Sequence, residues 1–310
     1  MLLGRGIRFP NVGIAFEDVP KNITVFGVTI AIYGIVIAIA LIVGVLVVQW
    51  QAKRTGQNKE VYLDFALYAI LFSLIGARLF YVAFHPEEFS EDPIQILNIR
   101  TGGLAIYGAI LMGLLVAFIY AKIRKLSFGE LADTCVGGLA AGQIIGRLGN
   151  FFNRESFGAY TDKLFAMQLN IHDVPSDFYC AYKDIVVKYA GNPALFQQIS
   201  EIRDHQQVVD GIVYIQVHPI FLYEMLWNLV LLILILLLIR HRTFKGEILL
   251  LYLGGYGLGR YWMESLRLDR LYIWGTTIPV AQVISLALVG LSVLIWIGMR
   301  IRCFRKEMKK

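Results

Sequence analysis

Seven apolar runs are the feature that most constrains the fold of this chain. An α-helix needs about 20 apolar residues to cross a bilayer. Runs near this length lie approximately at Val25–Val48, Val61–Phe84, Gly103–Ala121, Leu131–Phe152, Val217–Ile239, Ile248–Glu264 and Thr276–Met299. The chain is 57% hydrophobic and only 17% charged, which is unlike a soluble domain. The sequence therefore predicts an all-α polytopic membrane protein with seven transmembrane helices.

The basic residues predict the orientation of these helices. They follow the first, third, fifth and seventh runs, as Lys53, Arg54 and Lys59, as Lys122, Arg124 and Lys125, as Arg240, Arg242 and Lys245, and as six residues within 300–310. Loops rich in lysine and arginine stay in the cytoplasm. We therefore expect a multi-pass protein of the cell (inner, cytoplasmic) membrane with its N-terminus outside and its C-terminus inside. The net charge of +6 belongs to this pattern and does not indicate nucleic-acid binding.

The regions between the runs predict the domain organisation. Residues 1–24 lack the apolar core of a cleavable signal peptide, so we expect an extracytoplasmic arm there. Residues 25–152 hold helices one to four, and 217–299 hold helices five to seven. The long segment 153–216 is polar but contains aromatic residues, which predicts a small extracytoplasmic head. Residues 300–310 form a basic cytoplasmic tail.

Polar residues within or beside the apolar runs converge on the predicted outer side. Charged groups in a membrane are costly unless they are paired or functional. Scattered residues would divide between the two leaflets, so this convergence predicts a site facing the outer leaflet. The residues are Tyr33, Arg78, Gly103, Tyr107, Arg147, Asn150, Asn153, Glu155, His218, Tyr223, Glu224, Arg260, Glu264 and Arg267.

The segment GRLGNFFNRESFG, residues 146–158, is the densest of these clusters. Arg147 and Asn150 are three residues apart and share a helical face. Arg260 and Glu264 are four apart, and Arg267 is placed on the same face by its spacing of seven. Several arginines oriented by carboxylates would make a pocket for a phosphate.

Structural roles compete with these functional ones. Residues 146–158 can be a capped helix end with an interfacial arginine, and Arg260–Glu264 can be an ion pair that ties two helices together. Arg78 has no partner near it in the sequence, so a structural role is favoured there. An interfacial His218 is more often a hydrogen-bonding residue than a base, and Tyr223 fits an aromatic belt.

The same residues carry a resemblance to a known family. Residues 146–158 fit the signature G-R-x-G-N-F-x-N-x-E-x-x-G at every fixed position, and the chain resembles the prolipoprotein diacylglyceryl transferases. The similarity covers about Ile32–Arg267. It includes Tyr33-Gly34, the GARLFYV segment around Arg78, the RxGGL segment from Arg100, His218-Pro219 with Leu222-Tyr223-Glu224, and Arg260, Glu264 and Arg267.

The resemblance implies the first step of bacterial lipoprotein maturation. The diacylglyceryl group of phosphatidylglycerol would be transferred to the thiol of a lipobox cysteine in a prolipoprotein, with release of glycerol 1-phosphate and no metal or organic cofactor. By position, Arg147 and Arg260 would bind the headgroup and stabilise the departing phosphate. The predicted catalytic residues are Arg147, Arg260, Tyr107 and Glu264, and the predicted substrate-binding residues are Arg147, Asn150, Asn153, Glu155, Gly158, Tyr33, Arg78, Gly103, His218, Tyr223 and Arg267.

The sequence departs from the family pattern at one position. Many members have a histidine in the context F-H-G-G, where this chain has Ile106-Tyr107-Gly108-Ala109. A tyrosine is a poor base at neutral pH. Either neighbouring arginines ionise Tyr107, or another group is the base, or phosphate stabilisation removes the need for one.

Three other functions fit the sequence less well than transfer. A transporter or flippase for an anionic lipid or small anion would carry polar residues to the cytoplasmic side, and here the inner halves of the runs are almost purely Leu, Ile and Val. An intramembrane protease would need a dyad such as Ser–His, and Ser73, Ser285 and Ser292 have no motif around them. A receptor-like scaffold leaves the outer polar cluster unexplained. Cys135, Cys180 and Cys303 are scattered and suggest neither a disulfide framework nor a metal site.

Overall fold

The computed structural model describes residues 6–90, 92–98, 102–178, 180, 184, 188, 192–268, 270–273, 276 and 278–308. Arg100, the first residue of the RxGGL segment, lies outside these ranges. The chain divides into two compact units. The first comprises Met1–Ile42, Ala140–Ile233 and Leu253–Leu294, and the second comprises Val43–Leu139, Leu234–Tyr252 and Ile295–Lys310.

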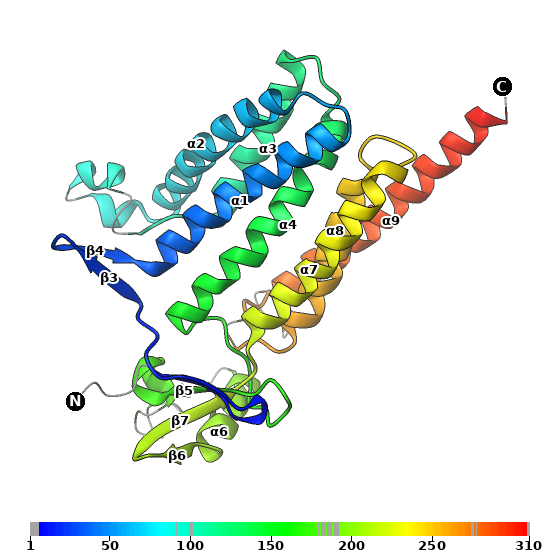
Figure 1. Ribbon diagram of the computed structural model, residues 1–310. Helices are drawn as coiled ribbons and strands as arrows, with labels where there is room; N and C mark the ends of the chain where they lie inside the picture. Colours follow the sequence, from blue (N-terminus) through cyan, green and yellow to red (C-terminus); the bar gives the residue numbers. More distant parts are fainter. Residues whose placement is uncertain are drawn as a thin grey trace. The chain divides into compact units, whose positions relative to one another are not determined.

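Long helices make up most of the chain (Figure 1). They are α1 Ile32–Arg54, α2 Lys59–Phe84, α3 Ile106–Ile123, α4 Phe128–Asn153, α7 Ile220–Leu238, α8 Glu247–Glu264 and α9 Val280–Glu307. Among the described residues, five helices are long and apolar enough to cross a membrane, namely α1, α2, α3, α9 and α7 with its continuation to His241. These helices are consistent with a polytopic membrane protein. Helices α4 and α8, which carry Arg147, Arg260 and Glu264, are not among the five.

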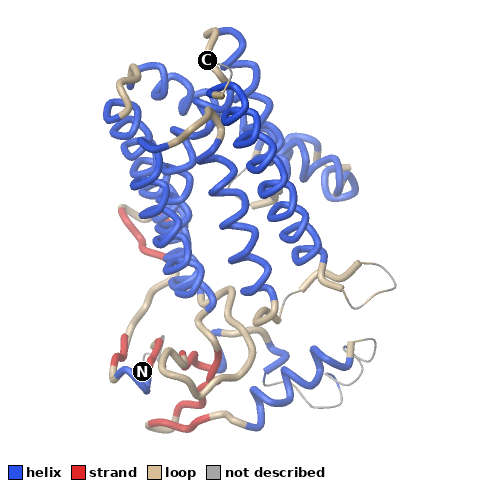
Figure 2. Tube along the Cα trace, turned by 90° about the vertical axis from the view of Figure 1, so that its right-hand side faces the viewer, coloured by secondary structure: helices blue, strands red, loops and turns tan. Residues whose placement is uncertain are grey.

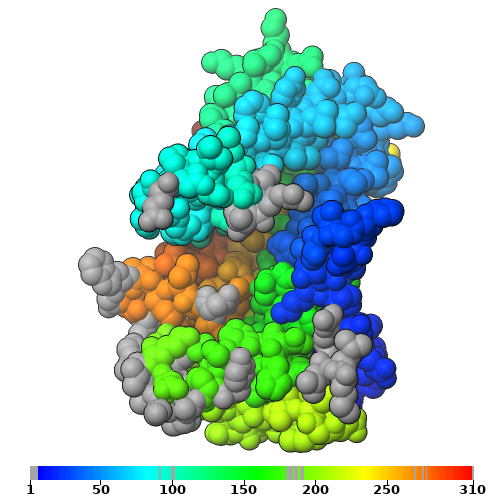
Figure 3. Space-filling model, turned by 90° about the vertical axis from the view of Figure 1, so that its left-hand side faces the viewer, coloured from blue at the N-terminus to red at the C-terminus, as the bar shows by residue number. Residues whose placement is uncertain are grey.

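The fold is not all-α as predicted, because the first unit contains a five-stranded antiparallel sheet. Its order is β2 (Ile14–Phe16), β1 (Ile7–Phe9), β5 (Met167–Asn170), β7 (Ile212–Val217) and β6 (Gln207–Val209). Figure 2 shows these strands in red with helix α6, Pro193–Asp204, and in Figure 3 the surface of this region is green and yellow-green. The core of the sheet includes Ile7, Leu169, Ile202 and Ile215, which are all 0% exposed. Strands of three to six residues are too short for a hydropathy reading to detect.

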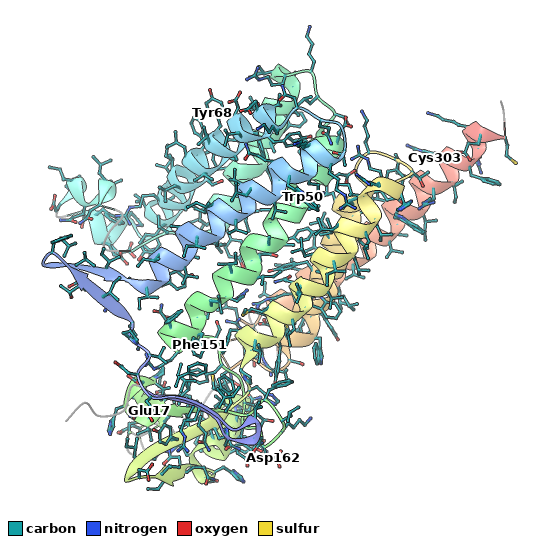
Figure 4. All side chains as sticks on the ribbon, viewed as in Figure 1. Glu17, Trp50, Tyr68, Phe151, Asp162 and Cys303 are labelled. Atoms are coloured by element: carbon teal, nitrogen blue, oxygen red, sulfur yellow. The ribbon has the colours of Figure 1, made fainter. Side chains whose placement is uncertain are left out.

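The sheet joins two regions that we predicted separately. Strand β1 of the arm pairs with β5 of the head, with Ile7 opposite Leu169. Phe151 of α4, labelled in Figure 4, fastens this region to a helix, since its ring centroid lies 5.5 Å from that of Phe16 and 5.6 Å from that of Phe221.

The first membrane helix begins later than predicted. The first seven residues of the predicted span, from Val25 to Ala31, belong instead to a hairpin of β3 (Asn22–Val25) and β4 (Val28–Ala31), and α1 begins at Ile32. Phe26 and Gly27 have φ values of 49° and 79°, as a two-residue hairpin turn requires. The β-branched residues that flank this turn favour strands, although their hydropathy resembles that of a membrane helix.

Within the first unit, α1 packs closely against α4 through glycines of the signature. A Cβ atom added to Gly146 would lie 3.6 Å from Ile37, and one added to Gly149 would lie 2.6 Å from the ring of Tyr33. Small residues allow such close approach between membrane helices. Tyr33 and Gly149 therefore bring the two helices together beside Arg147.

Within the second unit, α2 and α3 run side by side (Figure 1). They meet where Gly76 faces Gly108, and a side chain at either glycine would collide with the other helix. Asp133 of α4 is 0% exposed and accepts hydrogen bonds from the backbone N–H groups of Gly246 and Leu249, at 2.8 Å and 2.9 Å. It thereby satisfies N–H groups at the beginning of α8.

Candidate active site

Glu224 is the centre of the polar cluster in the first unit. It lies one turn into α7 and is 4% exposed. Its Oε2 atom lies 2.7 Å from Nη1 of Arg147, and its Oε1 atom lies 3.2 Å from Nη1 of Arg260 and 3.9 Å from Nη1 of Arg267. One buried carboxylate thus gathers guanidinium groups from α4, α8 and the segment after α8.

Arg260 contacts a second carboxylate. Its Nη2 atom lies 2.9 Å from Oε2 of Glu264, one helical turn further along α8. Among the described residues of this cluster, three guanidinium groups contact two carboxylates. The side chains of Arg147 and Arg260 are 25% and 24% exposed, so both can receive an anion while they stay paired.

The predicted helical alignment of Arg260, Glu264 and Arg267 is only partly correct. Helix α8 ends at Glu264, so Arg267 is not on the same helical face. A turn at Ser265-Leu266 redirects the chain, and Arg267 then pairs with Gly158 as an antiparallel bridge. Arg267 therefore reaches Glu224 from a non-helical segment.

Gly158 joins three segments of backbone. Its N–H donates to the carbonyl of His218 at 2.9 Å, and the neighbouring N–H of Ala159 donates to Leu266 at 3.1 Å. A Cβ atom at Gly158 would lie 2.5 Å from the Leu266 carbonyl oxygen. Only glycine permits this close approach, so Gly158 has a structural reason to be present beside any contact with substrate.

The end of α4 is held by hydrogen bonds within the signature. The N–H of Glu155 donates to the carbonyl of Asn150 at 3.0 Å, and the Asn153 amide donates to the Glu155 carboxylate at 3.2 Å.

Arg154, at a variable position of the signature, is 3% exposed and lies 3.1 Å from the Asp173 carboxylate. It also donates to the carbonyl of Val19 at 2.5 Å, so it anchors the N-terminal arm. We predicted no role for Arg154, and its variable position gave no signal.

His218 and Tyr223 contact each other. The Nδ1 atom of His218 lies 3.1 Å from the Tyr223 hydroxyl. Burial, and secondarily the charge of Lys163, lower the pKa of His218, so its ring is neutral at pH 7. These two residues connect the backbone junction at Gly158 to the first turn of α7.

Arg78, Gly103 and Tyr107 belong to the second unit. Arg78 is 6% exposed and donates to the backbone carbonyls of Gln95, Ile96, Asn98, Gly102 and Gly103. Gly103 has a φ of 67° and leaves no room for a side chain beside this guanidinium. These contacts support the structural alternative for Arg78. Tyr107, in the first turn of α3, is 56% exposed.

Glu224 is the site residue whose role we did not predict. A single carboxylate just after the first turn of a strongly apolar helix was the available signal, because such a charge needs a partner. Its partners could not be identified, since they come from α4 and from the end of α8.

Known proteins resemble this chain over most of its length. It is 35% identical to the phosphatidylglycerol–prolipoprotein diacylglyceryl transferase of Halalkalibacterium halodurans over 268 residues, which covers 86% of this chain and 82% of the relative. The enzyme of the same name from Bacillus cytotoxicus is 34% identical over 262 residues, covering 84% of this chain and 85% of the relative. That of Listeria monocytogenes is 34% identical over 283 residues, covering 91% and 90%.

The family model described as prolipoprotein diacylglyceryl transferase matches residues 20–298. This match includes every element of the arginine cluster and the whole signature. Together with the relatives, it shows that the chain belongs to the prolipoprotein diacylglyceryl transferase family.

Proposed function

We propose that this protein transfers the diacylglyceryl group of phosphatidylglycerol to the cysteine thiol of a prolipoprotein lipobox. This transferase reaction is the first step of lipoprotein maturation. Family membership supports it, and the arrangement of Arg147 and Arg260 on Glu224 is the observation in the structure that carries it. Phosphatidylglycerol and a prolipoprotein are its substrates.

The reaction is a displacement at a glycerol carbon. The substrate sulfur forms a bond to this carbon while the bond from carbon to the phosphate oxygen breaks. The electron pair of that bond stays on the phosphate oxygen. The thiol gives up its proton to an acceptor, from which it passes to the released glycerol 1-phosphate or to water. Negative charge therefore develops on the phosphate, and groups placed to meet such charge are a large part of enzymatic catalysis.

Arg147 and Arg260 are suited to this task. Their positions are set in advance by Glu224, so little reorganisation is needed when the lipid binds. Each guanidinium has further N–H donors for phosphate oxygens. Glu264 orients Arg260, and Tyr33 positions α1 against α4. The proposed substrate site is also lined by Asn150, Asn153, Glu155 and Tyr223. Arg267 adds positive charge to it.

The thiol also requires a partner that accepts its proton. Tyr107 stays the candidate that occupies the position of the family histidine. If the Tyr107 hydroxyl takes part, Tyr107→Phe has a lower kcat than the wild type. Tyr107→His, which offers a base at the same position, is then more active than Tyr107→Phe.

We further propose that all seven long helices cross the membrane, α4 and α8 included. The basic residues beside α1, α3, α7 and α9 support a cytoplasmic location for those ends. With the N-terminus outside, the arginine cluster faces the outer leaflet of the cytoplasmic membrane. Residues 153–216 then form an extracytoplasmic head.

Membranes that contain the protein test the proposed function directly. They are incubated with phosphatidylglycerol labelled in its acyl chains and with a synthetic lipobox peptide. The proposal predicts label on the peptide cysteine, and none on a control peptide with serine at that position. Label that stays entirely in the lipid would overturn it.

A further inference from the structure

A cavity of about 650 Å³ in the first unit lies beside the end of α4. This volume is within the range typical of small-ligand sites. Asn153 and Glu155 of the signature line one part of it, and Asp177, Leu195 and Ile199 of the head line another. The reaction with the lipid phosphate does not use these head residues.

The cavity shares a wall with the arginine cluster. In this wall Gly158 pairs with Arg267 as a backbone bridge. Arg267 contacts Glu224 in the cluster, whereas the next residue, Leu268, lines the cavity. Phe157, the neighbour of Gly158, lines the cavity as well. The paired backbone at Gly158 and Arg267 therefore adjoins both the cavity and the proposed site of transfer.

The charges of the cavity differ from those of the cluster. Asp173 is paired with Arg154 and Asp177 with Lys188. The carboxylate of Glu155 and the ammonium group of Lys21 add one charge of each sign to the lining. No excess of guanidinium groups is present among the described lining residues, so a second phosphate is not favoured. A wall of Phe157, Phe178 and Leu195 beside charges of both signs fits a peptide, which has apolar side chains and a dipolar backbone.

We propose that this cavity binds the residues of the prolipoprotein that follow the modified cysteine. This inference rests on the proposed transfer reaction and adds a binding site for one of its substrates. Arg147 and Asn153 are about 9 Å apart along the axis of α4, at 1.5 Å per residue. An extended peptide covers this distance in about three residues, at roughly 3.3 Å each. This axial distance is a lower bound, so residues from about the third after the cysteine onward reach the cavity while the thiol lies at the cluster.

Two peptide substrates test this proposal on the full-length protein in membranes. Both contain the same lipobox, but one ends in an amide at the cysteine and the other continues for six residues. We expect wild-type kcat/KM to be about tenfold higher for the long peptide than for the short one, as binding of a few side chains in a pocket allows. Equal values for the two peptides would overturn the proposal.

Substitutions that fill the cavity test its location. For Leu195→Trp, the kcat/KM of the long peptide divided by that of the short peptide is expected to fall to near one, because the indole occupies the cavity. Gln197→Trp, at an exposed position of the same helix, is the matched control and keeps the wild-type ratio. Pro175→Trp fills the cavity from an exposed loop position, so it keeps the test decisive if Leu195→Trp does not fold.

The outcomes separate this inference from the proposed function. If both filling substitutions lower kcat/KM for the two peptides equally, the cavity does not bind the peptide extension and the inference is wrong. If the wild-type protein labels neither peptide, the transfer reaction itself is contradicted.

Discussion

Arg147 on α4 and Glu224 on α7 form an ion pair with 2.7 Å between Nη1 and Oε2. The Glu224 side chain is almost fully buried, while a quarter of the Arg147 side chain is exposed. A buried charge that has lost its partner is strongly destabilising, so this pair holds both helices in place. It also leaves one side of Arg147 available to a substrate.

Replacement of Glu224 by glutamine is expected to reduce transfer by about 100-fold. The amide keeps the shape of the side chain but no longer offsets the charges of Arg147 and Arg260. The two guanidinium groups then repel each other and move apart. The measurement is kcat/KM for labelled phosphatidylglycerol. Glu201→Gln, at an exposed position of α6, is the control and should behave as the wild type. Wild-type kcat/KM for Glu224→Gln would show that Glu224 does not organise the site.

Replacement of Gly158 by alanine is expected to destabilise the fold by about 1–3 kcal/mol. The added methyl group would meet the Leu266 carbonyl oxygen at 2.5 Å, and backbone cannot move away as a flexible side chain can. Thermal unfolding in detergent measures the effect. Gly290→Ala is the matched control, since a Cβ there meets nothing within 4 Å. Equal unfolding temperatures for the two variants would contradict the structural role of Gly158.

Replacement of Gly149 by alanine is expected to separate α1 from α4, because its methyl group would meet the ring of Tyr33 at 2.6 Å. The unfolding temperature should fall, and a second substitution, Tyr33→Ala, should recover part of the loss by making room. This double-mutant comparison isolates the contact between the two residues. Strictly additive losses would argue that they do not interact.

Stability is expected to fall at acidic pH partly through His218. Its pKa is lowered in the folded state, so below about pH 6.5 the unfolded chain takes up a proton that the folded chain still refuses. The stability that neutral His218 contributes at pH 7 is lost as the pH falls from about 6.5 toward the pKa of His218 in the folded state. The measurement is the unfolding temperature between pH 7.5 and pH 5. His218→Gln should show a shallower decline, and parallel declines would exclude this contribution.

The helices of this fold could be predicted from the sequence because apolar runs coincide with them. Helix α2 begins at Lys59 where Val61 was expected, and α8 begins at Glu247 where Ile248 was expected. The sheet could not be predicted, because β1 and β5 are short and lie far apart in the sequence. Strand β4 and the turn before it were predicted as membrane helix, since hydropathy does not distinguish β-branched strands from helical residues.

The candidate site could be predicted in composition but not in its contacts. The convergence of polar residues on the predicted outer side indicated Arg147, Arg260 and Glu264, and the structure brings them together in one cluster. The role of Glu224 depends on packing between helices that are distant in sequence. The position of Arg267 depends on where α8 ends, and residue spacing assumed that the helix continues.

The most direct measurement of the central claim is transfer of labelled diacylglyceryl to a lipobox peptide by Arg147→Ala, together with release of glycerol 1-phosphate. Arg302→Ala, at an exposed position near the end of α9, is the control. The account predicts that Arg147→Ala lowers both products by at least about 100-fold while Arg302→Ala retains wild-type activity. Full transfer by Arg147→Ala would contradict the assignment of this arginine to the departing phosphate.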